Sequence, residues 1–210
     1  MVRQLSPLIK AALPSLVALA LVWGLLNWWT LGFQAFTSYS HVRESAAPLP
    51  QSPPRLTLID QVGKPLQLDE LQGKYYLMTF GFLDCTGTCP VSMAAFNEIN
   101  GHLQSLGIDD LVLLTITLDP ARDRQQHLHY VWQSFDSPAG WILARPQVQD
   151  IPAYWAKLRR MGMWVDQDKL GTPIHDDRSF LINRAGMIVQ SFAGVPPIEA
   201  LLESIQRDQG

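Results

Sequence analysis

Residues 11–33 form one continuous apolar stretch, AALPSLVALALVWGLLNWWTLGF, in which only Ser15, Asn27 and Thr30 are polar. As a helix this stretch would be about 34 Å long, which exceeds the roughly 30 Å of a bilayer's hydrocarbon core. Trp28 and Trp29 lie near its end, as in an interfacial aromatic belt. The pattern predicts a transmembrane anchor over residues 11–33.

The charges before this stretch predict its orientation. Arg3 and Lys10 are the charged residues that precede it, and both are positive. Under the positive-inside rule, residues 1–10 would stay in the cytoplasm and the rest of the chain would face outward. A cleaved signal peptide has the same positive start but a shorter apolar core and a small-residue cleavage site. A mitochondrial transit peptide and a buried core helix fit the stretch less well.

A polar segment separates the apolar stretch from the remainder of the chain. Residues 34–54 carry four prolines near their end and predict a linker, and residues 55–210 predict the main domain. From Glu44 onward the chain holds all 19 acidic residues and 13 of the 16 basic ones, so this part has a formal net charge of −6. We therefore expect an acidic domain on a tether.

Apolar runs and helical spacings alternate along this domain. The runs YYLMTFGF at 75–82 and LVLLTITL at 111–118 are typical of strands buried on both faces. Residues 90–106 predict a helix, with a proline in its first turn and apolar residues at helical spacing. Further strands are predicted at 56–59, 65–68, 141–144, 178–183 and 187–192, and further helices at 124–135, 152–161 and 197–207.

This alternation predicts an α/β domain with a largely parallel sheet. A β-hairpin and a helix that follow βαβ units give the order of a thioredoxin-like fold. The fold class is thus α/β, thioredoxin-like, with an N-terminal transmembrane helix. The chain is 47% hydrophobic and 17% charged, which excludes a disordered protein, and a pI near 5.9 gives no basic footprint for nucleic acid.

The two cysteines, Cys85 and Cys89, lie where a buried strand ends and a helix begins. Ligands bind at the carboxyl ends of strands in open α/β sheets, and a helix N-terminus favours the reactive thiolate. The negative charge of Asp84 beside Cys85 opposes this stabilisation of the thiolate. Three intervening residues allow both sulfurs to converge on one soft ion. The alternative is a structural disulfide, but one that closes so short a loop would constrain the unfolded chain little.

Of the five histidines, His175 is the one with a plausible place near the cysteines. It precedes a predicted strand, in a loop that faces the cysteine site in a thioredoxin-like topology. Imidazole and thiolate ligands together suit copper or zinc. We assign the other four to the linker and to predicted helices: His41, His102, His127 and His129.

The motifs around these residues resemble the Sco/SenC copper proteins over about residues 55–208. The resemblance rests on Phe80-Gly81-Phe82 before Cys85-x-x-x-Cys89-Pro90, on Leu118-Asp119-Pro120-Ala121-Arg122-Asp123, and on His175 five residues before Phe180-Leu181-Ile182. It implies a thioredoxin fold that binds a copper ion through Cys85, Cys89 and His175. This chain has Thr86 and Gly87 where family members usually have proline and an acidic residue.

The resemblance implies a metallochaperone that delivers copper to, or prepares the thiols of, the binuclear copper centre of cytochrome c oxidase. Its expected partners are the oxidase copper-centre subunit, a copper donor protein or a thiol reductant, and the membrane through the N-terminal helix. Its expected location is the bacterial inner membrane, single-pass, with the soluble domain in the periplasm. The alternative is an enzyme, a thiol–disulfide oxidoreductase acting through Cys85 and Cys89. A peroxiredoxin-like activity ranks third.

Overall fold

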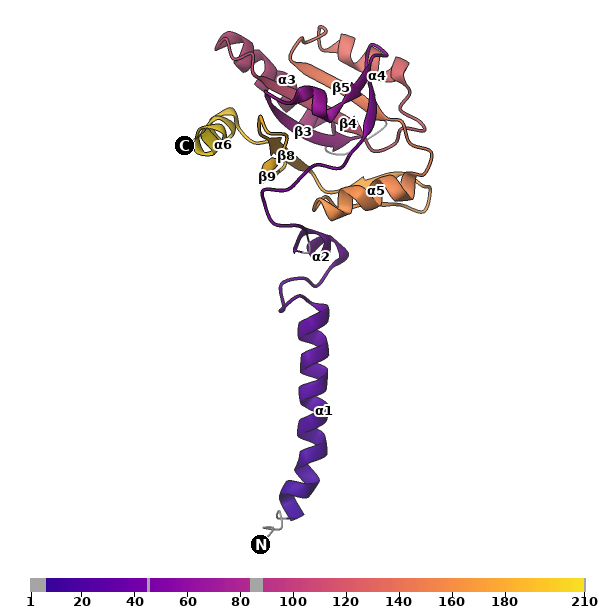
Figure 1. Cartoon of the computed structure of the whole chain (residues 1–210). Helices are drawn as coiled ribbons and strands as arrows, with labels where there is room; N and C mark the ends of the chain where they lie inside the picture. Colours follow the sequence, from indigo (N-terminus) through magenta and orange to yellow (C-terminus); the bar gives the residue numbers. More distant parts are fainter. Residues whose placement is uncertain (1–6, 45, 84–88, 210) are drawn as a thin grey trace. The chain divides into compact units, whose positions relative to one another are not determined.

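The computed structural model describes residues 7–44, 46–83 and 89–209, and the chain divides into two compact units, residues 1–45 and 46–210. Figure 1 shows their helices and strands. The first unit holds helix α1 (Pro7–Trp29) and the short helix α2 (Ser38–Glu44). The second unit holds all the strands and the remaining helices.

Helix α1 is apolar around its circumference, with leucine and tryptophan side chains such as Leu19, Trp23 and Trp28 more than 60% exposed. No helix among the described residues combines the length and apolarity needed to cross a bilayer. The predicted transmembrane span over residues 11–33 is therefore not supported. The helix ends at Trp29, and positive φ angles of 51° at Leu31 and 66° at Phe33 take the backbone out of the helical conformation.

A seven-stranded mixed sheet forms the centre of the second unit, in the order β2-β1-β5-β4-β3-β8-β9. Strands β3 (Tyr75–Gly81), β4 (Leu111–Thr117) and β5 (Trp141–Pro146) are parallel. The antiparallel strands are β1 (Thr57–Asp60) and β2 (Pro65–Gln67) on one side and β8 (Arg178–Ile182) and β9 (Ile188–Ala193) on the other. These strands confirm the predicted α/β class.

Helices cover both faces of the sheet, as the two apolar central strands require. Helices α3 (Cys89–Ser105), α4 (Gln125–Ser134) and α6 (Ile198–Gln209) pack on the face that includes Leu77 and Leu113. Helix α5 (Ile151–Arg160) packs on the opposite face, which includes Met78 and Leu114. Successive residues of β3 and β4 thus enter different halves of the core, as the alternation of a strand dictates.

Four elements lie where the sequence predicted none. A 3₁₀ helix, η1 (Leu68–Leu71), follows β2, and a separate hairpin is formed by β6 (Val165–Gln167) and β7 (Pro173–His175). The predicted linker also contains α2, and Gln51 forms two backbone hydrogen bonds with Ile188, of 3.1 and 2.8 Å. The end of the linker therefore belongs to the compact second unit.

Helix α5 is joined to β4 by two hydrogen bonds from its aromatic side chains. The Tyr154 hydroxyl donates to the Thr117 carbonyl at 3.0 Å, and the Trp155 indole N–H donates to the Leu118 carbonyl at 3.0 Å. Tyr154 is fully buried, and burial raises the pKa of its hydroxyl well above the usual value. Tyr154 is therefore a neutral donor at any ordinary pH.

We expect Tyr154→Phe to destabilise the protein by about 1–3 kcal/mol, because it leaves the buried Thr117 carbonyl without its donor. The matched control is Tyr130→Phe, since the Tyr130 side chain is 73% exposed and should change stability by less than about 0.5 kcal/mol. Urea unfolding followed by circular dichroism measures both. Equal losses in the two variants would contradict this assignment.

Candidate metal centre

Of the two predicted cysteine ligands, Cys89 belongs to a described element, helix α3. Cys89 is the first residue of this helix, and its side chain is not among those described. Cys85 falls within residues 84–88, outside the described residues. In the part of the chain that the structure describes, no group of three or more histidine, cysteine or acidic side chains could hold a metal ion. The assignment of Cys85, Cys89 and His175 thus stays a prediction.

His175 is the last residue of β7, and its imidazole is half-buried and held in a defined orientation. Its Nδ1 lies 2.7 Å from the Asp176 carbonyl oxygen, which can only accept, so Nδ1 carries the proton and the lone pair of a neutral ring is on Nε2. Burial lowers the pKa of His175, although the Asp176 carbonyl and the Asp177 carboxylate partly offset this. The ring is therefore mainly neutral at pH 7, the form that binds metals.

The ring of Phe82 packs against this imidazole. The two rings meet edge to face, with centroids 6.1 Å apart and planes at 73°. Phe82 directly follows β3 and is buried, so its ring has little freedom to move. The histidine of one chain segment is thus packed against the segment that leads toward Cys85.

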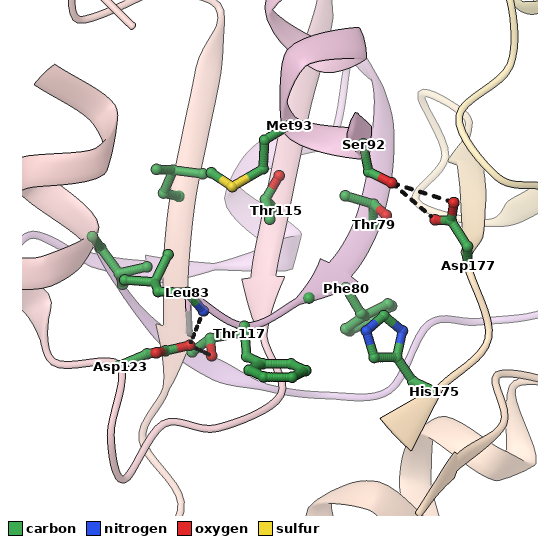
Figure 2. A pocket seen from close by; sticks show the side chains of 14 residues that line it. Thr79, Phe80, Leu83, Ser92, Met93, Thr115, Thr117, Asp123, His175 and Asp177 are labelled. Atoms are coloured by element: carbon green, nitrogen blue, oxygen red, sulfur yellow. Dashed lines mark hydrogen bonds between the residues drawn. The ribbon is translucent and has the colours of Figure 1, made fainter. Parts of the chain in front are cut away.

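A second contact joins the start of α3 to the segment that carries His175. The Ser92 hydroxyl points at the carboxylate of Asp177 (Figure 2) and can donate to either of its oxygens, at 3.2 or 3.3 Å. The Asp177 carbonyl also accepts from the Gly194 N–H at 2.5 Å. Since Ser92 is three residues after Cys89, this bond holds the first turn of α3 beside the residues that follow β7.

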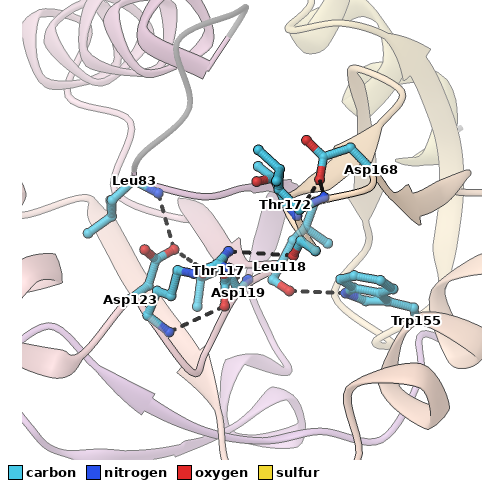
Figure 3. Close-up of polar contacts among 11 residues, drawn as sticks. Leu83, Thr117, Leu118, Asp119, Asp123, Trp155, Asp168 and Thr172 are labelled. Carbon is cyan, nitrogen blue, oxygen red and sulfur yellow. Dashed lines mark hydrogen bonds and ion pairs between the residues drawn. The ribbon is translucent and has the colours of Figure 1, made fainter.

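The carboxylate of Asp123 holds the backbone that leads into the cysteine segment. Asp123 is 1% exposed, and its Oδ2 accepts from the Leu83 N–H at 3.1 Å and from the Thr117 hydroxyl (Figures 2 and 3). Leu83 is the last described residue before residues 84–88. One buried side chain therefore ties the end of β3 to the end of β4.

Asp119 has a structural role in the same turn. Its carboxylate pairs with the Arg122 guanidinium at 2.8 Å and accepts from the Arg122 N–H at 3.2 Å. The Arg122 side chain also lies 3.5 Å from the Gly171 carbonyl, in the turn between β6 and β7. Asp168 closes that turn, because one of its oxygens accepts from the N–H groups of Leu170 and Thr172, both at 2.8 Å (Figure 3).

Asp176 places a buried carboxyl group next to His175. Burial raises its pKa to about 6, although Arg178, with its Nε 3.5 Å from the carboxylate, acts in the opposite direction. Among the described residues neither carboxylate oxygen accepts a hydrogen bond. Sequence reasoning did not single out Asp176 or Ser92, because the surroundings of both side chains depend on elements distant in the chain.

The remaining histidines lie on helices: His41 on α2, His102 on α3, and His127 and His129 on α4. The rings of His129 and Trp132 pack with centroids 5.9 Å apart. None of the four belongs to a metal-binding group of the described residues.

The parallel central strands and the helices on both faces of the sheet define a thioredoxin-like fold. The chain matches the family model of SCO1/SenC over residues 50–208. It therefore belongs to the SCO1/SenC family.

Individual relatives are similar to parts of this chain. An SCO2-like protein of Rickettsia felis is 44% identical over 66 residues, 31% of this chain and 32% of that protein. The matched stretches span about a third of the length of the first curated relatives.

Solved structures share the fold over most of the chain. A SCO1/SenC family lipoprotein from Bacillus anthracis has a TM-score of 0.69 at 22% identity, covering 78% of this chain and 98% of that one. Bradyrhizobium japonicum ScoI, solved with copper bound, has a TM-score of 0.61 at 22% identity, covering 74% and 98%. These likenesses confirm the thioredoxin-like fold that the sequence predicts.

We expect Asp123→Ala to expose the Leu83 amide to solvent, because the acceptor of its hydrogen bond is lost. Two donors would lose this buried acceptor, so stability should fall by about 1–3 kcal/mol. Hydrogen exchange measured by NMR should show faster exchange at Leu83 under conditions where the protein stays folded.

The matched control is Asp109→Ala, which removes an exposed carboxylate far from this turn in the sequence. Its Leu83 amide should exchange as in the wild type. Unchanged Leu83 protection in Asp123→Ala would show that the carboxylate does not hold this segment.

Proposed function

We propose that this protein binds a copper ion through Cys85, Cys89 and His175 and delivers it to the binuclear copper centre of cytochrome c oxidase during assembly. The observation that carries the proposal is the orientation of His175. Its Nδ1–H donates to the Asp176 carbonyl, its ring is packed against Phe82, and its neutral form has the Nε2 lone pair for a metal. The copper-bound Bradyrhizobium japonicum relative supports the choice of metal.

The chemistry of the three donors suits copper as a cargo. Thiolate is a soft ligand that favours Cu(I), and imidazole is an accepted ligand of copper. Three ligands would leave the ion open to an incoming donor group. Transfer would then proceed by exchange of one ligand at a time with the oxidase copper-centre subunit, without a general acid or base. A copper donor protein or a thiol reductant would act before this step.

Membrane association at the periplasmic face of the bacterial inner membrane is part of this proposal. Helix α1 exposes large apolar side chains all around its axis, including Leu16, Leu21 and Trp29 at more than 60% each. Apolar surface of this extent is favourable in contact with lipid or with another protein. A crossing of the bilayer by residues 11–33 is not carried into the proposal.

We expect the reduced full chain to bind one Cu(I) ion under anaerobic conditions, measured by competition with a chromophoric chelator. Cys85→Ala, Cys89→Ala and His175→Ala should each weaken binding at least tenfold, because each removes one proposed ligand. The matched control is His102→Ala, which removes an exposed histidine from the last turn of α3 and should bind as the wild type does. Equal affinities for His175→Ala and His102→Ala would rule out the imidazole ligand.

A second candidate function is thiol–disulfide exchange, favoured by the position of Cys89 at a helix N-terminus, where a thiolate is stabilised. One thiolate would attack a partner disulfide and release a partner thiolate. The other cysteine would then resolve the mixed disulfide, which leaves a Cys85–Cys89 disulfide here and a reduced partner.

We expect His175→Ala to separate the two functions, because disulfide exchange needs both thiols but no imidazole. Its rate of reduction of a model disulfide should stay within about threefold of the wild-type rate while its copper affinity falls. Stopped-flow thiol assays measure the rate. If copper binding is retained and exchange is lost, the assignment of His175 as a copper ligand is wrong.

A further inference from the structure

A groove on the second unit is lined by three basic side chains. It lies between the segment 47–55 and the C-terminal end of α5, and Arg55, Lys157 and Arg160 line it. Gln51 closes one side of the groove, since its amide donates to the Ala47 carbonyl at 3.1 Å and to the Met161 carbonyl at 3.4 Å. No acidic side chain is among its described lining residues.

This concentration of positive charge contrasts with the rest of the domain. From Glu44 onward the chain carries a formal net charge of −6. Four other cations of the second unit have acidic partners in ion pairs: Arg122, Arg159, Arg178 and Arg184. Within the described residues, no ion pair involves Arg55, Lys157 or Arg160. Three like charges that face one groove repel one another unless an anion lies between them.

The helix dipole explains only part of this pattern. Cations in the last turn of a helix interact favourably with its C-terminus, which accounts for Lys157 and Arg160 on α5. It does not account for Arg55, which comes from the extended segment before β1. Arg159 of the same turn points elsewhere, because its Nε donates to the Val165 carbonyl at 2.7 Å. The groove therefore gathers cations from two separate elements.

The position of the groove in the chain indicates which anion it meets. Residues 30–46 connect apolar α1 to the first lining residue, Ala47, so a fully extended connection would reach at most about 60 Å. Clusters of basic side chains in a protein that associates with a membrane are attracted to the anionic lipids of its surface. Exposed lysine and arginine side chains suit the phosphate groups of such a surface.

We propose that Arg55, Lys157 and Arg160 form a binding site for the phosphate groups of anionic phospholipids, which holds the second unit at the membrane surface. This inference rests on the membrane association proposed above, and it is independent of the copper ligands. Lipid binding in the groove would turn this face of the second unit toward the bilayer, because α5 and the segment 47–55 are both parts of that compact unit.

The test is binding of the full chain to vesicles of phosphatidylcholine alone and to vesicles that also contain 30% phosphatidylglycerol, measured by flotation. The wild type should bind the anionic vesicles at least tenfold more tightly, and 0.5 M NaCl should remove most of this gain. The variant Arg55→Gln/Lys157→Gln/Arg160→Gln should lose most of the gain. Soluble glycerol phosphate added in excess should reduce the gain if the groove recognises the phosphate group.

The matched control is Lys64→Gln/Lys74→Gln/Arg124→Gln, which removes the same charge from exposed positions outside the groove and should keep most of the gain. Circular dichroism and copper affinity should match the wild type in both variants. Equal losses in the two variants overturn the groove assignment, as does a wild type that binds both vesicle types equally. A wild type that binds neither vesicle type overturns the proposed membrane association as well. Copper binding is measured in a separate assay, so the copper proposal stands or falls independently of this result.

Discussion

The parallel pairing of β3 with β4 is the constraint on which the rest of the second unit depends. Both strands are apolar on both faces, from Tyr75 to Phe80 and from Leu111 to Thr117, so neither face can be left to water. A parallel pair also needs a crossover helix, which α3 supplies on one face. Helix α5 covers the other face, and its aromatic side chains bond to the carbonyls at the end of β4. The carboxyl ends of both strands thereby meet at one edge of the sheet.

Three separate contacts between chain segments hold the candidate metal centre at that edge. Asp123 holds the backbone after β3 to the end of β4. Phe82 packs against the imidazole of His175, and Ser92 bonds to the carboxylate of Asp177. Each contact joins segments that are far apart in the chain, so the orientation of His175 depends on the whole sheet. These contacts give the proposed imidazole ligand a defined orientation.

The basic groove and the proposed metal ligand His175 belong to the same compact unit. The acidic surplus of the domain is interrupted at the groove of Arg55, Lys157 and Arg160, which lies at the C-terminal end of α5 and beside the segment 47–55. The proposed ligand His175 belongs to β7, which pairs with β6 beyond that same helix. A bilayer contact through the groove would therefore restrict how the metal centre is presented to its acceptor, because both are parts of one compact unit.

The sequence by itself determined the elements and the position of the chemistry in the chain. The apolar runs and helical spacings predicted every strand of the main sheet and all four long helices of the second unit within about two residues, because each pattern reports the burial of its own segment. The motif around Cys85, Cys89 and His175 predicted the family. Apolarity alone predicted a helix that continues to residue 33, whereas the observed helix ends at Trp29, because apolarity does not report the backbone turn at Leu31 and Phe33.

Only the tertiary structure decided what surrounds the chemistry. His175 was expected in a loop but lies on β7, a three-residue strand too short and polar for a periodic pattern. The bond between Ser92 and Asp177 joins residues 85 positions apart, and the basic groove combines Arg55 with the end of α5. Contacts of this kind follow from the order of strands in the sheet and the face on which each helix packs. Local sequence patterns do not encode that order, because they record burial but not the partner that provides it.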